Sequence, residues 1–321
     1  MRPKVLFIDT AHPYLMQSLE NMGFECRYFP GYTRDDFLRI AGEYEGIIIR
    51  SKIKLDKEFL KKASKLKFIG RVGAGMENID AAYAEQKGIS CLNAPEGNRD
   101  AVAEQAVGML LMLLNNLLKA DSEVRKGIWL REENRGIELG GKTVGIIGYG
   151  NTGSAFAKKL KGFDVKILAY DKYKTGFGND PVHEVTLENL FEESDIVSLH
   201  VPLTEETTYM VNSTFINRFK KPFFLINTSR GKVVNTADLV DALEKGKVRG
   251  ACLDVLEYEG LSFENLSREQ LPEPFYKLTA MKNVVLSPHI AGWTHESHYK
   301  LAAVLVEKIK KLYEKNGGLE V

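Results

Sequence analysis

The chain has 321 residues, of which 44% are hydrophobic and 27% charged, and its formal net charge at pH 7 is +1. These values predict a soluble globular protein of two domains. The near-zero net charge argues against nucleic acid or a membrane surface as a partner, and no apolar run reaches the roughly 18 residues of a membrane helix.

The first part of the chain alternates short apolar runs with amphipathic stretches. The runs are rich in β-branched residues and predict strands at residues 5–8, 26–29, 47–49, 68–72 and 90–92. Strands separated by helical stretches are typical of a parallel sheet that is covered by helices.

A long helical pattern follows at residues 102–124. Its apolar face is wider than that of a lone surface helix, so we expect it to lie between domains or against a second subunit. A second series of apolar runs then predicts strands at residues 144–147, 165–169, 196–199, 223–226, 250–253 and 284–286. The last helix is predicted at residues 295–313 and can pack on the first domain, which would make that domain discontinuous.

The second series opens with a glycine turn, GYGNTG, between a strand and a helix. Gly148 suits the tight turn, Gly150 allows close approach of a pyrophosphate, and Gly153 allows the helix to pack on the strand. The helix N-terminus attracts phosphates, and Asp171 at the end of the next strand can accept hydrogen bonds from a ribose. This unit predicts a dinucleotide site, with a plain strand–turn–helix as the alternative.

Polar residues that follow the predicted strands are candidates for chemistry, because ligands of open α/β sheets bind beyond the carboxyl ends of strands. Arg230, Glu259 and His289 occupy such positions. An arginine binds carboxylates, a histidine exchanges protons near neutral pH, and a carboxylate can orient a histidine ring. Taken singly, each can also be a solvated or structural residue. The glycine loop from Arg71 to Asp80 predicts either an anion-binding nest or an ordinary turn.

The motifs together resemble the D-isomer-specific 2-hydroxyacid dehydrogenases, and among them most of all the short D-3-phosphoglycerate dehydrogenases. The resemblance rests on RVGAGMENID, NAPEGNRDAVAE, GYGNTG, HVPLTEET, NTSRG, GACLDVLEYE and SPHIAGWT, which span nearly the whole chain in the family's order. It implies an α/β fold in which a Rossmann NAD-binding domain is inserted into a discontinuous flavodoxin-like substrate domain. The inserted domain would take residues 98–289, and the substrate domain residues 1–97 and 290–321.

The resemblance also implies roles for the residues that match family motifs. Arg230 corresponds to the substrate-polarising arginine, Glu259 to the catalytic carboxylate and His289 to the general acid/base. With NAD as the cofactor, its contacts fall on Gly148, Gly150, Asn151, Thr152, Gly153, Asp171, Thr228, Ser229, Arg230, Asp254, His289, Ala291 and Gly292.

For the substrate, the resemblance implies that the backbone around Ala74 and Gly75, together with Arg230, holds the carboxylate. Arginines that match Arg50, Arg71 and Arg131 would hold a phosphate, the last reaching over from the partner subunit of a homodimer.

The activity that the resemblance implies is hydride transfer between NAD and a D-2-hydroxy acid. The leading substrate is 3-phosphoglycerate, oxidised to 3-phosphohydroxypyruvate for serine biosynthesis, and the rival activity is that of a glyoxylate or hydroxypyruvate reductase. An interpretation of another class is an NAD-sensing binding protein, similar to corepressors that resemble this family. Because the chain ends at Val321 without a regulatory domain, we expect no feedback by serine through such a domain.

Several positions depart from the family pattern. Gly260 stands where a proline commonly follows the glutamate, Asn235 where an aspartate is common, and Trp293 where small residues are common. Residues 260–282 form a long connection, so we expect the loop that carries Glu259 to be mobile.

The three cysteines, Cys26, Cys91 and Cys252, are odd in number and far apart. They predict free thiols in a cytoplasmic protein, and the start of the chain has no signal-type apolar stretch. No cysteine or carboxylate stands at ligand spacing beside His289, His295 and His298, so we expect no metal site.

Overall fold

The chain folds into two compact units, seen in a computed structural model that describes residues 2–260, 266 and 271–315. The N-terminal unit holds the residues up to Asn98 and those from Trp293 onward. The central unit holds Arg99–Gly260 and the described residues up to Gly292.

The central unit is built on a seven-stranded parallel sheet with the order β12-β11-β10-β9-β6-β7-β8. Its strands are β6 Thr143–Ile147, β7 Lys166–Tyr170, β8 Val182–Glu184, β9 Ile196–Leu199, β10 Phe223–Asn227, β11 Val248–Leu253 and β12 Val284–Leu286. The six strands predicted from apolar runs are confirmed. The seventh, β8, lies at the edge and escapes prediction because its sequence VHE has a single apolar residue.

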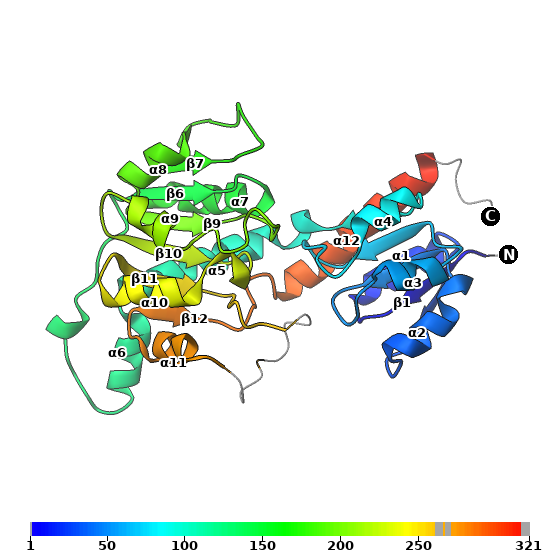
Figure 1. The fold of residues 1–321 in the computed structure, drawn as a ribbon, viewed down its shortest axis with the longest axis horizontal. Helices are drawn as coiled ribbons and strands as arrows, with labels where there is room; N and C mark the ends of the chain where they lie inside the picture. Colours follow the sequence, from blue (N-terminus) through cyan, green and yellow to red (C-terminus); the bar gives the residue numbers. More distant parts are fainter. Residues whose placement is uncertain (1, 261–265, 267–270, 316–321) are drawn as a thin grey trace. The chain divides into compact units, whose positions relative to one another are not determined.

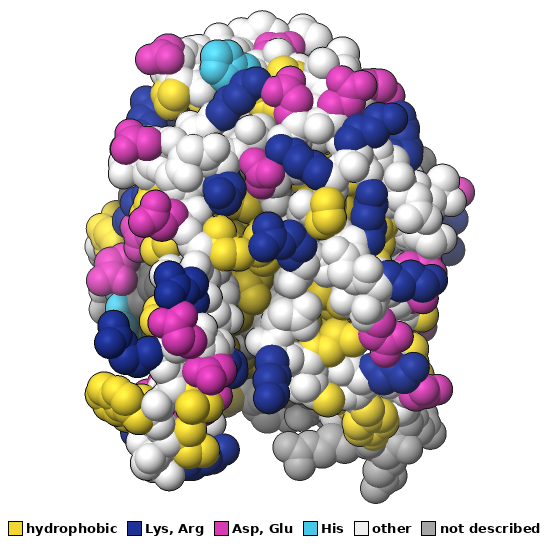
Figure 2. Space-filling model, turned by 90° about the vertical axis from the view of Figure 1, so that its left-hand side faces the viewer, with side chains coloured by type: hydrophobic (Ala, Val, Ile, Leu, Met, Phe, Trp, Pro, Cys, Tyr) yellow, Lys and Arg dark blue, Asp and Glu magenta, His cyan; other side chains and the backbone are white. Residues whose placement is uncertain are grey.

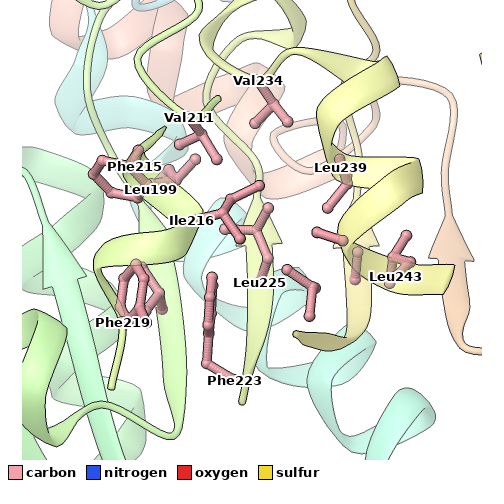
Figure 3. Packing of buried hydrophobic residues seen from close by; sticks show 14 of the residues in the cluster. Leu199, Val211, Phe215, Ile216, Phe219, Phe223, Leu225, Val234, Leu239 and Leu243 are labelled. Atoms are coloured by element: carbon pink, nitrogen blue, oxygen red, sulfur yellow. The ribbon is translucent and has the colours of Figure 1, made fainter. Parts of the chain in front are cut away.

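Helices cover both faces of this sheet (Figure 1). One face carries α8 Leu187–Glu193, α9 Ser213–Arg218, α10 Thr236–Glu244 and α11 Glu273–Ala280, and the other carries α5 Pro95–Leu114 and α7 Asn151–Leu160. On the first face the rings of Phe219 and Phe223 stack with centroids 3.9 Å apart, and Phe215 meets Phe219 edge-on at 5.6 Å (Figure 3). Burial of these large rings fixes α9 on the sheet.

The prediction of a single helix at residues 102–124 is wrong. The structure has two helices, α5 and α6 Leu117–Val124, bent by 62° at the break between them. Asn116 causes the break: its φ is 53°, a left-handed value that asparagine tolerates better than most residues, and its amide donates to the carbonyl of Arg135 at 3.3 Å. No single described helix is long and apolar enough to span a membrane, and only α5 and α6 taken together reach that length.

The N-terminal unit has a five-stranded parallel sheet with the order β2-β1-β3-β4-β5. Its strands are β1 Lys4–Phe7, β2 Glu25–Tyr28, β3 Gly46–Ile49, β4 Phe68–Arg71 and β5 Ser90–Asn93. One face packs on α2 Arg34–Ile40, α3 Lys57–Lys62 and α4 Ala81–Gln86, and the other on α1 Pro13–Asn21 and α12 His295–Lys315. Short 3-10 turns lie at Ala41–Glu43, Glu132–Asn134, Lys161–Phe163 and Gly231–Val233. Two parallel sheets, each covered on both faces, confirm the predicted α/β class.

The connection at residues 260–282 contains α11, which the sequence analysis does not anticipate. The mobility expected for this connection falls largely on residues 261–265 and 267–270, which lie outside the described residues. The surface shown in Figure 2 carries acidic and basic side chains interspersed, as the balanced composition of the chain suggests.

Candidate active site

Three neighbouring strands of the central unit end beside one another, and each is followed by a predicted catalytic residue. Arg230 follows β10, Glu259 follows β11 and His289 follows β12. Because these strands are adjacent and parallel, their carboxyl ends meet at one edge of the sheet.

The His289 ring and the Glu259 carboxylate are hydrogen-bonded, with Nδ1 and Oε2 2.6 Å apart. Both side chains are largely buried. The second oxygen of Glu259 accepts a hydrogen bond from the backbone N–H of Leu256, which fixes the carboxylate in place. A ring oriented through Nδ1 presents Nε2 on its other side, the arrangement that a general acid/base needs.

The backbone of His289 is held in an unfavourable conformation. Its φ is 56°, in the left-handed region, which costs a residue other than glycine about 1–3 kcal/mol. Asp254 holds this backbone on both sides: its carbonyl accepts from the N–H of His289 at 2.7 Å, and its carboxylate accepts from the N–H groups of Ile290 and Ala291, both at 2.9 Å. Asp254, expected to contact the cofactor, therefore anchors the loop that carries His289.

Two further residues bind Asp254, and sequence reasoning missed both. The hydroxyl of Ser287 donates to Asp254 Oδ1 at 2.5 Å, and the amide of Gln105 donates to the same oxygen at 2.9 Å and to Ser287 Oγ at 3.0 Å. Gln105 lies on α5, 149 residues before Asp254, so no local pattern relates the two. Ser287 had one signal, its place in the SPH motif.

The loop that carries Arg230 is fixed by a buried asparagine. The Oδ1 atom of Asn227, which is 0% exposed, accepts from the N–H and the hydroxyl of Ser229 at 3.0 and 2.7 Å. The Asn227 amide donates to the carbonyl of Arg230 at 3.0 Å, and Arg230 Nη1 donates to the carbonyl of Ser229 at 2.7 Å. The guanidinium is thus held at the same edge of the sheet as the His289–Glu259 pair.

The glycine turn joins β6 to α7 with the geometry that its spacing predicts. Gly148 has a φ of 91°, and a β-carbon on Gly153 would lie 2.1 Å from the carbonyl oxygen of Gly148. Asp171 ties the turn to the end of β7, because its carboxylate accepts from the N–H groups of Tyr149, Tyr173 and Lys174 at 2.8, 2.9 and 3.1 Å.

The turn is open beside Gly150. A β-carbon on Gly150 would meet no atom within 4 Å, and Gly150 caps α7 without a side-chain hydrogen bond. Asn151 and Thr152, in the first turn of α7, are half-buried. At the end of β10, Thr228 Oγ1 is buried without a hydrogen-bond partner among the described residues. Open space before a helix N-terminus and a buried hydroxyl that lacks a partner both fit NAD.

The N-terminal unit holds two of the predicted phosphate arginines. Arg71, at the end of β4, is 8% exposed, and its Nη1 would lie 1.5 Å from a β-carbon on Gly73, so a side chain at residue 73 would displace the guanidinium. Arg50 follows β3, and its guanidinium lies 4.8 Å from the ring centre of Trp293, an exposed cation–π contact.

The remaining predicted substrate contacts are distributed between the units. The carbonyl of Ala74 accepts from the amide of Asn93 at 2.6 Å, and Gly75 follows it in the N-terminal unit. Arg131 lies in the central unit, exposed, after α6. Arg50, Arg71, Ala74 and Gly75 thus belong to one unit, and Arg131 and Arg230 to the other.

One departure from the family pattern has a clear structural role. Asn235 caps α10, and its side chain accepts from the N–H of Asp238 at 3.0 Å. Asparagine and aspartate are equally good in this position, so the exchange preserves the cap. Among the described residues no group of three or more histidine, cysteine or acidic side chains could hold a metal ion.

Comparison with known proteins agrees with the geometry. The family model described as D-isomer specific 2-hydroxyacid dehydrogenase, NAD binding domain, matches residues 107–291. A D-3-phosphoglycerate dehydrogenase of Archaeoglobus fulgidus is 35% identical over 95% of this chain, which covers 56% of that protein. A hydroxypyruvate reductase of Thermotoga maritima is 38% identical over 87% of this chain, which covers 88% of it. This chain therefore spans about half of the first relative's length and most of the second's.

Among solved structures, a D-lactate dehydrogenase of Aquifex aeolicus in complex with NAD and lactic acid superposes with a TM-score of 0.82. It is 31% identical, with 97% of this chain and 96% of that chain covered. These matches confirm the predicted Rossmann-type domain, NAD as the cofactor and the resemblance to this family. The chain belongs to the D-isomer specific 2-hydroxyacid dehydrogenase family.

Proposed function

We propose that this protein is an NAD-dependent dehydrogenase that interconverts a D-2-hydroxy acid and the corresponding 2-keto acid. The observation that carries the proposal is the 2.6 Å hydrogen bond between His289 and Glu259 at the carboxyl edge of the sheet. A largely buried carboxylate–imidazole pair whose histidine has a strained backbone is typical of a proton-transfer site.

Each catalytic residue has its own role in this proposal. His289 takes the hydroxyl proton of the substrate on Nε2 during oxidation and returns it during reduction, while Glu259 orients the ring through Nδ1. Arg230 binds the carboxylate and the C2 oxygen with its fork of donors. When bound, NAD supplies the hydride acceptor at nicotinamide C4.

For the cofactor, we assign the pyrophosphate to the turn of Gly148, Gly150 and Gly153 and to the N-terminus of α7, with Asn151 and Thr152. We assign the ribose to Asp171, whose negative charge disfavours the extra phosphate of NADP. The buried hydroxyl of Thr228 and the loop from Ser229 to Arg230 face the remaining part of the cofactor in this proposal, as do Ala291 and Gly292.

As substrate we propose 3-phosphoglycerate, oxidised to 3-phosphohydroxypyruvate in serine biosynthesis. Arg50, Arg71 and Arg131 would hold the phosphate, and the backbone at Ala74 and Gly75 the carboxylate. The burial of Arg71 supports this, because a guanidinium that is shielded from water forms strong charge-assisted hydrogen bonds with an anion. Three arginines on one dianion would each contribute about 1.5–3 kcal/mol.

A glyoxylate or hydroxypyruvate reductase is the second candidate. One observation favours it: Trp293 covers the guanidinium of Arg50. This activity needs no phosphate site.

A substrate panel separates the two activities. Purified protein would be assayed with NADH and phosphohydroxypyruvate, hydroxypyruvate, glyoxylate, 2-oxoglutarate and pyruvate. We expect the highest kcat/KM with phosphohydroxypyruvate, and a higher value with glyoxylate or hydroxypyruvate would replace the first candidate by the second. Absence of turnover with every acid, despite NADH binding, would favour an NAD-sensing protein.

Variants sharpen this test. Arg71→Ala and Arg131→Ala should each lower kcat/KM for phosphohydroxypyruvate about 10- to 100-fold, while hydroxypyruvate reduction changes little. Arg135→Ala is the matched control for Arg131, because Arg135 lies in the same loop and pairs with Glu132. Equal losses on both acids would indicate damage to the fold and would remove these arginines from the phosphate site.

We also propose that the protein is a homodimer that associates through α6 and the loop after it. Large apolar side chains are exposed there: Leu117, Leu118, Val124, Ile128, Trp129 and Leu130. Trp129 is 76% exposed, which is rare for an isolated surface and common at an interface. Trp129→Lys should yield monomers in sedimentation, whereas Tyr28→Lys, on the exposed edge of β2, should not. A wild-type monomer would exclude this interface.

The three cysteines are free thiols in the structure. Free thiols are typical of a reducing compartment, so we propose a cytoplasmic location, which fractionation of the source cells would test.

A further inference from the structure

The amide of Gln105 occupies a central position behind the His289 loop. From the middle of α5 it donates to Asp254 Oδ1 at 2.9 Å and to Ser287 Oγ at 3.0 Å, while Ser287 donates to the same Asp254 oxygen at 2.5 Å. These three polar groups form a closed triangle of hydrogen bonds that links helix α5 to the residues after β11 and β12.

The triangle surrounds a carboxyl group that has almost no access to water. Asp254 is 1% exposed, and its carboxylate is surrounded by neutral donors: the amide of Gln105, the hydroxyl of Ser287 and the N–H groups of Ile290 and Ala291. A buried carboxylate is tolerated only when its oxygens accept hydrogen bonds, so each of these donors matters for its position.

We propose that Gln105 is a positioning residue for the catalytic histidine, an inference that rests on the proposed function. It fixes the Asp254 carboxylate in the one orientation that binds Ile290 and Ala291. Those two bonds hold His289 at its left-handed φ of 56°, where the ring meets Glu259. Without the amide, the carboxylate turns toward other donors and His289 relaxes to an ordinary backbone conformation.

The alternative is that Gln105 only fastens α5 to the sheet. Both roles predict a loss of stability when the amide is removed, but they differ in what happens to the histidine. A positioning residue changes turnover and the His289–Glu259 hydrogen bond, whereas a packing residue leaves both unchanged in the folded protein.

Two substitutions of similar size separate these roles. Gln105→Met removes both donors. Gln105→Glu keeps the shape and donates to Asp254 only while its own carboxyl group is protonated. Two carboxyl groups at hydrogen-bond distance hold one proton to higher pH than an isolated carboxyl does, so the acid form persists at mildly acidic pH.

We expect Gln105→Met to lower kcat about 10- to 100-fold, the effect of an ångström-scale displacement of a catalytic group. The Kd for NADH, measured by fluorescence, should stay within about threefold of wild type, because the glycine turn is untouched. Gln105→Glu should approach the activity of wild type at acidic pH and lose it as pH rises and the second carboxylate forms. Glu104→Gln is the matched control, since Glu104 immediately precedes Gln105 on α5 and pairs with Lys159 at the surface.

A second readout does not depend on turnover. The proton between His289 Nδ1 and Glu259 should give a low-field imidazole resonance in the cofactor-free protein, assigned by its loss in His289→Asn. We expect this resonance to shift or vanish in Gln105→Met and to reappear in Gln105→Glu at acidic pH.

The outcomes decide the proposal in each case. A lower Tm with unchanged kcat and an unchanged resonance would overturn it. If Gln105→Met does not fold, the test rests on folded Gln105→Glu alone. Its kcat is then measured against pH beside that of wild type, and parallel profiles would refute the proposal. If no 2-keto acid is reduced, the proposed function fails, while the resonance still reports whether Gln105 positions His289.

Discussion

Gly231 and Leu256 approach so closely that a β-carbon on Gly231 would lie 1.9 Å from the carbonyl oxygen of Leu256. The contact joins the loop that carries Arg230 to the loop that carries Glu259. Since the N–H of Leu256 also donates to Glu259, the absence of a side chain at residue 231 contributes to the geometry of the catalytic pair.

Gly231→Ala should therefore displace Leu256 and, with it, Glu259. We expect a destabilisation of about 1–3 kcal/mol, typical of overpacking, and a fall in kcat that exceeds any change in NADH affinity. Gly162→Ala is the control, because a β-carbon there meets no atom within 4 Å. Urea unfolding and steady-state kinetics on both variants check this, and a variant that loses stability but keeps full kcat would separate Gly231 from the catalytic pair.

His289→Asn should abolish most turnover and leave NADH binding intact. A general acid/base contributes about 10²- to 10⁴-fold, and asparagine is chosen because it tolerates the left-handed φ of residue 289. Single-turnover reduction and NADH titration measure the two effects. Wild-type rates in this variant would remove His289 from the proton-transfer step.

Glu259→Gln tests the orienting role of the carboxylate. The Leu256 N–H can still bind the amide oxygen, but the group that then meets His289 Nδ1 is the NH₂, a donor. The ring must turn or adopt its other tautomer, so we expect kcat to fall by about 10- to 100-fold with little change in NADH affinity. Glu257→Gln is a nearby control, because Glu257 accepts from the N–H of Thr236 instead. An unchanged kcat in Glu259→Gln would contradict the assignment.

Local patterns in the sequence predict most of this fold. Apolar runs of β-branched residues identify the buried strands, because parallel strands are covered on both faces, and the glycine spacing identifies the turn before α7. The pattern fails at β8, an edge strand with little apolar character, and at Asn116, where one residue in a left-handed conformation breaks a continuous apolar stripe.

The active site is harder to predict from local sequence patterns than the fold is. Arg230, Glu259 and His289 can be proposed from their positions after strands, but their meeting at one edge depends on the strand order, which a single sequence does not display. Gln105 carries no local signal at all, because its partners lie 149 and 182 residues further along the chain.

Cofactor preference should respond to the charge of Asp171. In Asp171→Asn the amide oxygen can still accept from the N–H groups of Tyr173 and Lys174, which share one oxygen of Asp171, but the hydrogen bond from the N–H of Tyr149 to the other oxygen is lost. The repulsion of the extra phosphate is lost with the charge. We expect the ratio of NADH to NADPH efficiency to fall at least several-fold. The Kd values of both cofactors check this independently of turnover. An unchanged ratio would show that a residue other than Asp171 discriminates between NADH and NADPH.

Stability at acidic pH should depend on His200, at the end of β9. Burial lowers the pKa of this histidine to about 3, whereas the unfolded chain binds the proton near pH 6.5. Its contribution to stability is therefore complete above pH 6.5 and is lost as pH falls toward the folded pKa, at about 1.4 kcal/mol per pH unit.

His200→Gln should test this. The amide can still bond Ser198, which now meets the ring at 2.8 Å, but it cannot take up a proton. We expect the variant to be less stable at pH 7.5, because the contact of the ring with Phe156 is lost. Between pH 7.5 and pH 5, however, its free energy of unfolding should fall by about 2 kcal/mol less than that of wild type. Urea unfolding at the two pH values measures the difference. His183→Gln, on the exposed β8, is the control and should keep the wild-type slope, and an equally steep slope in His200→Gln would show that other groups cause the acid sensitivity.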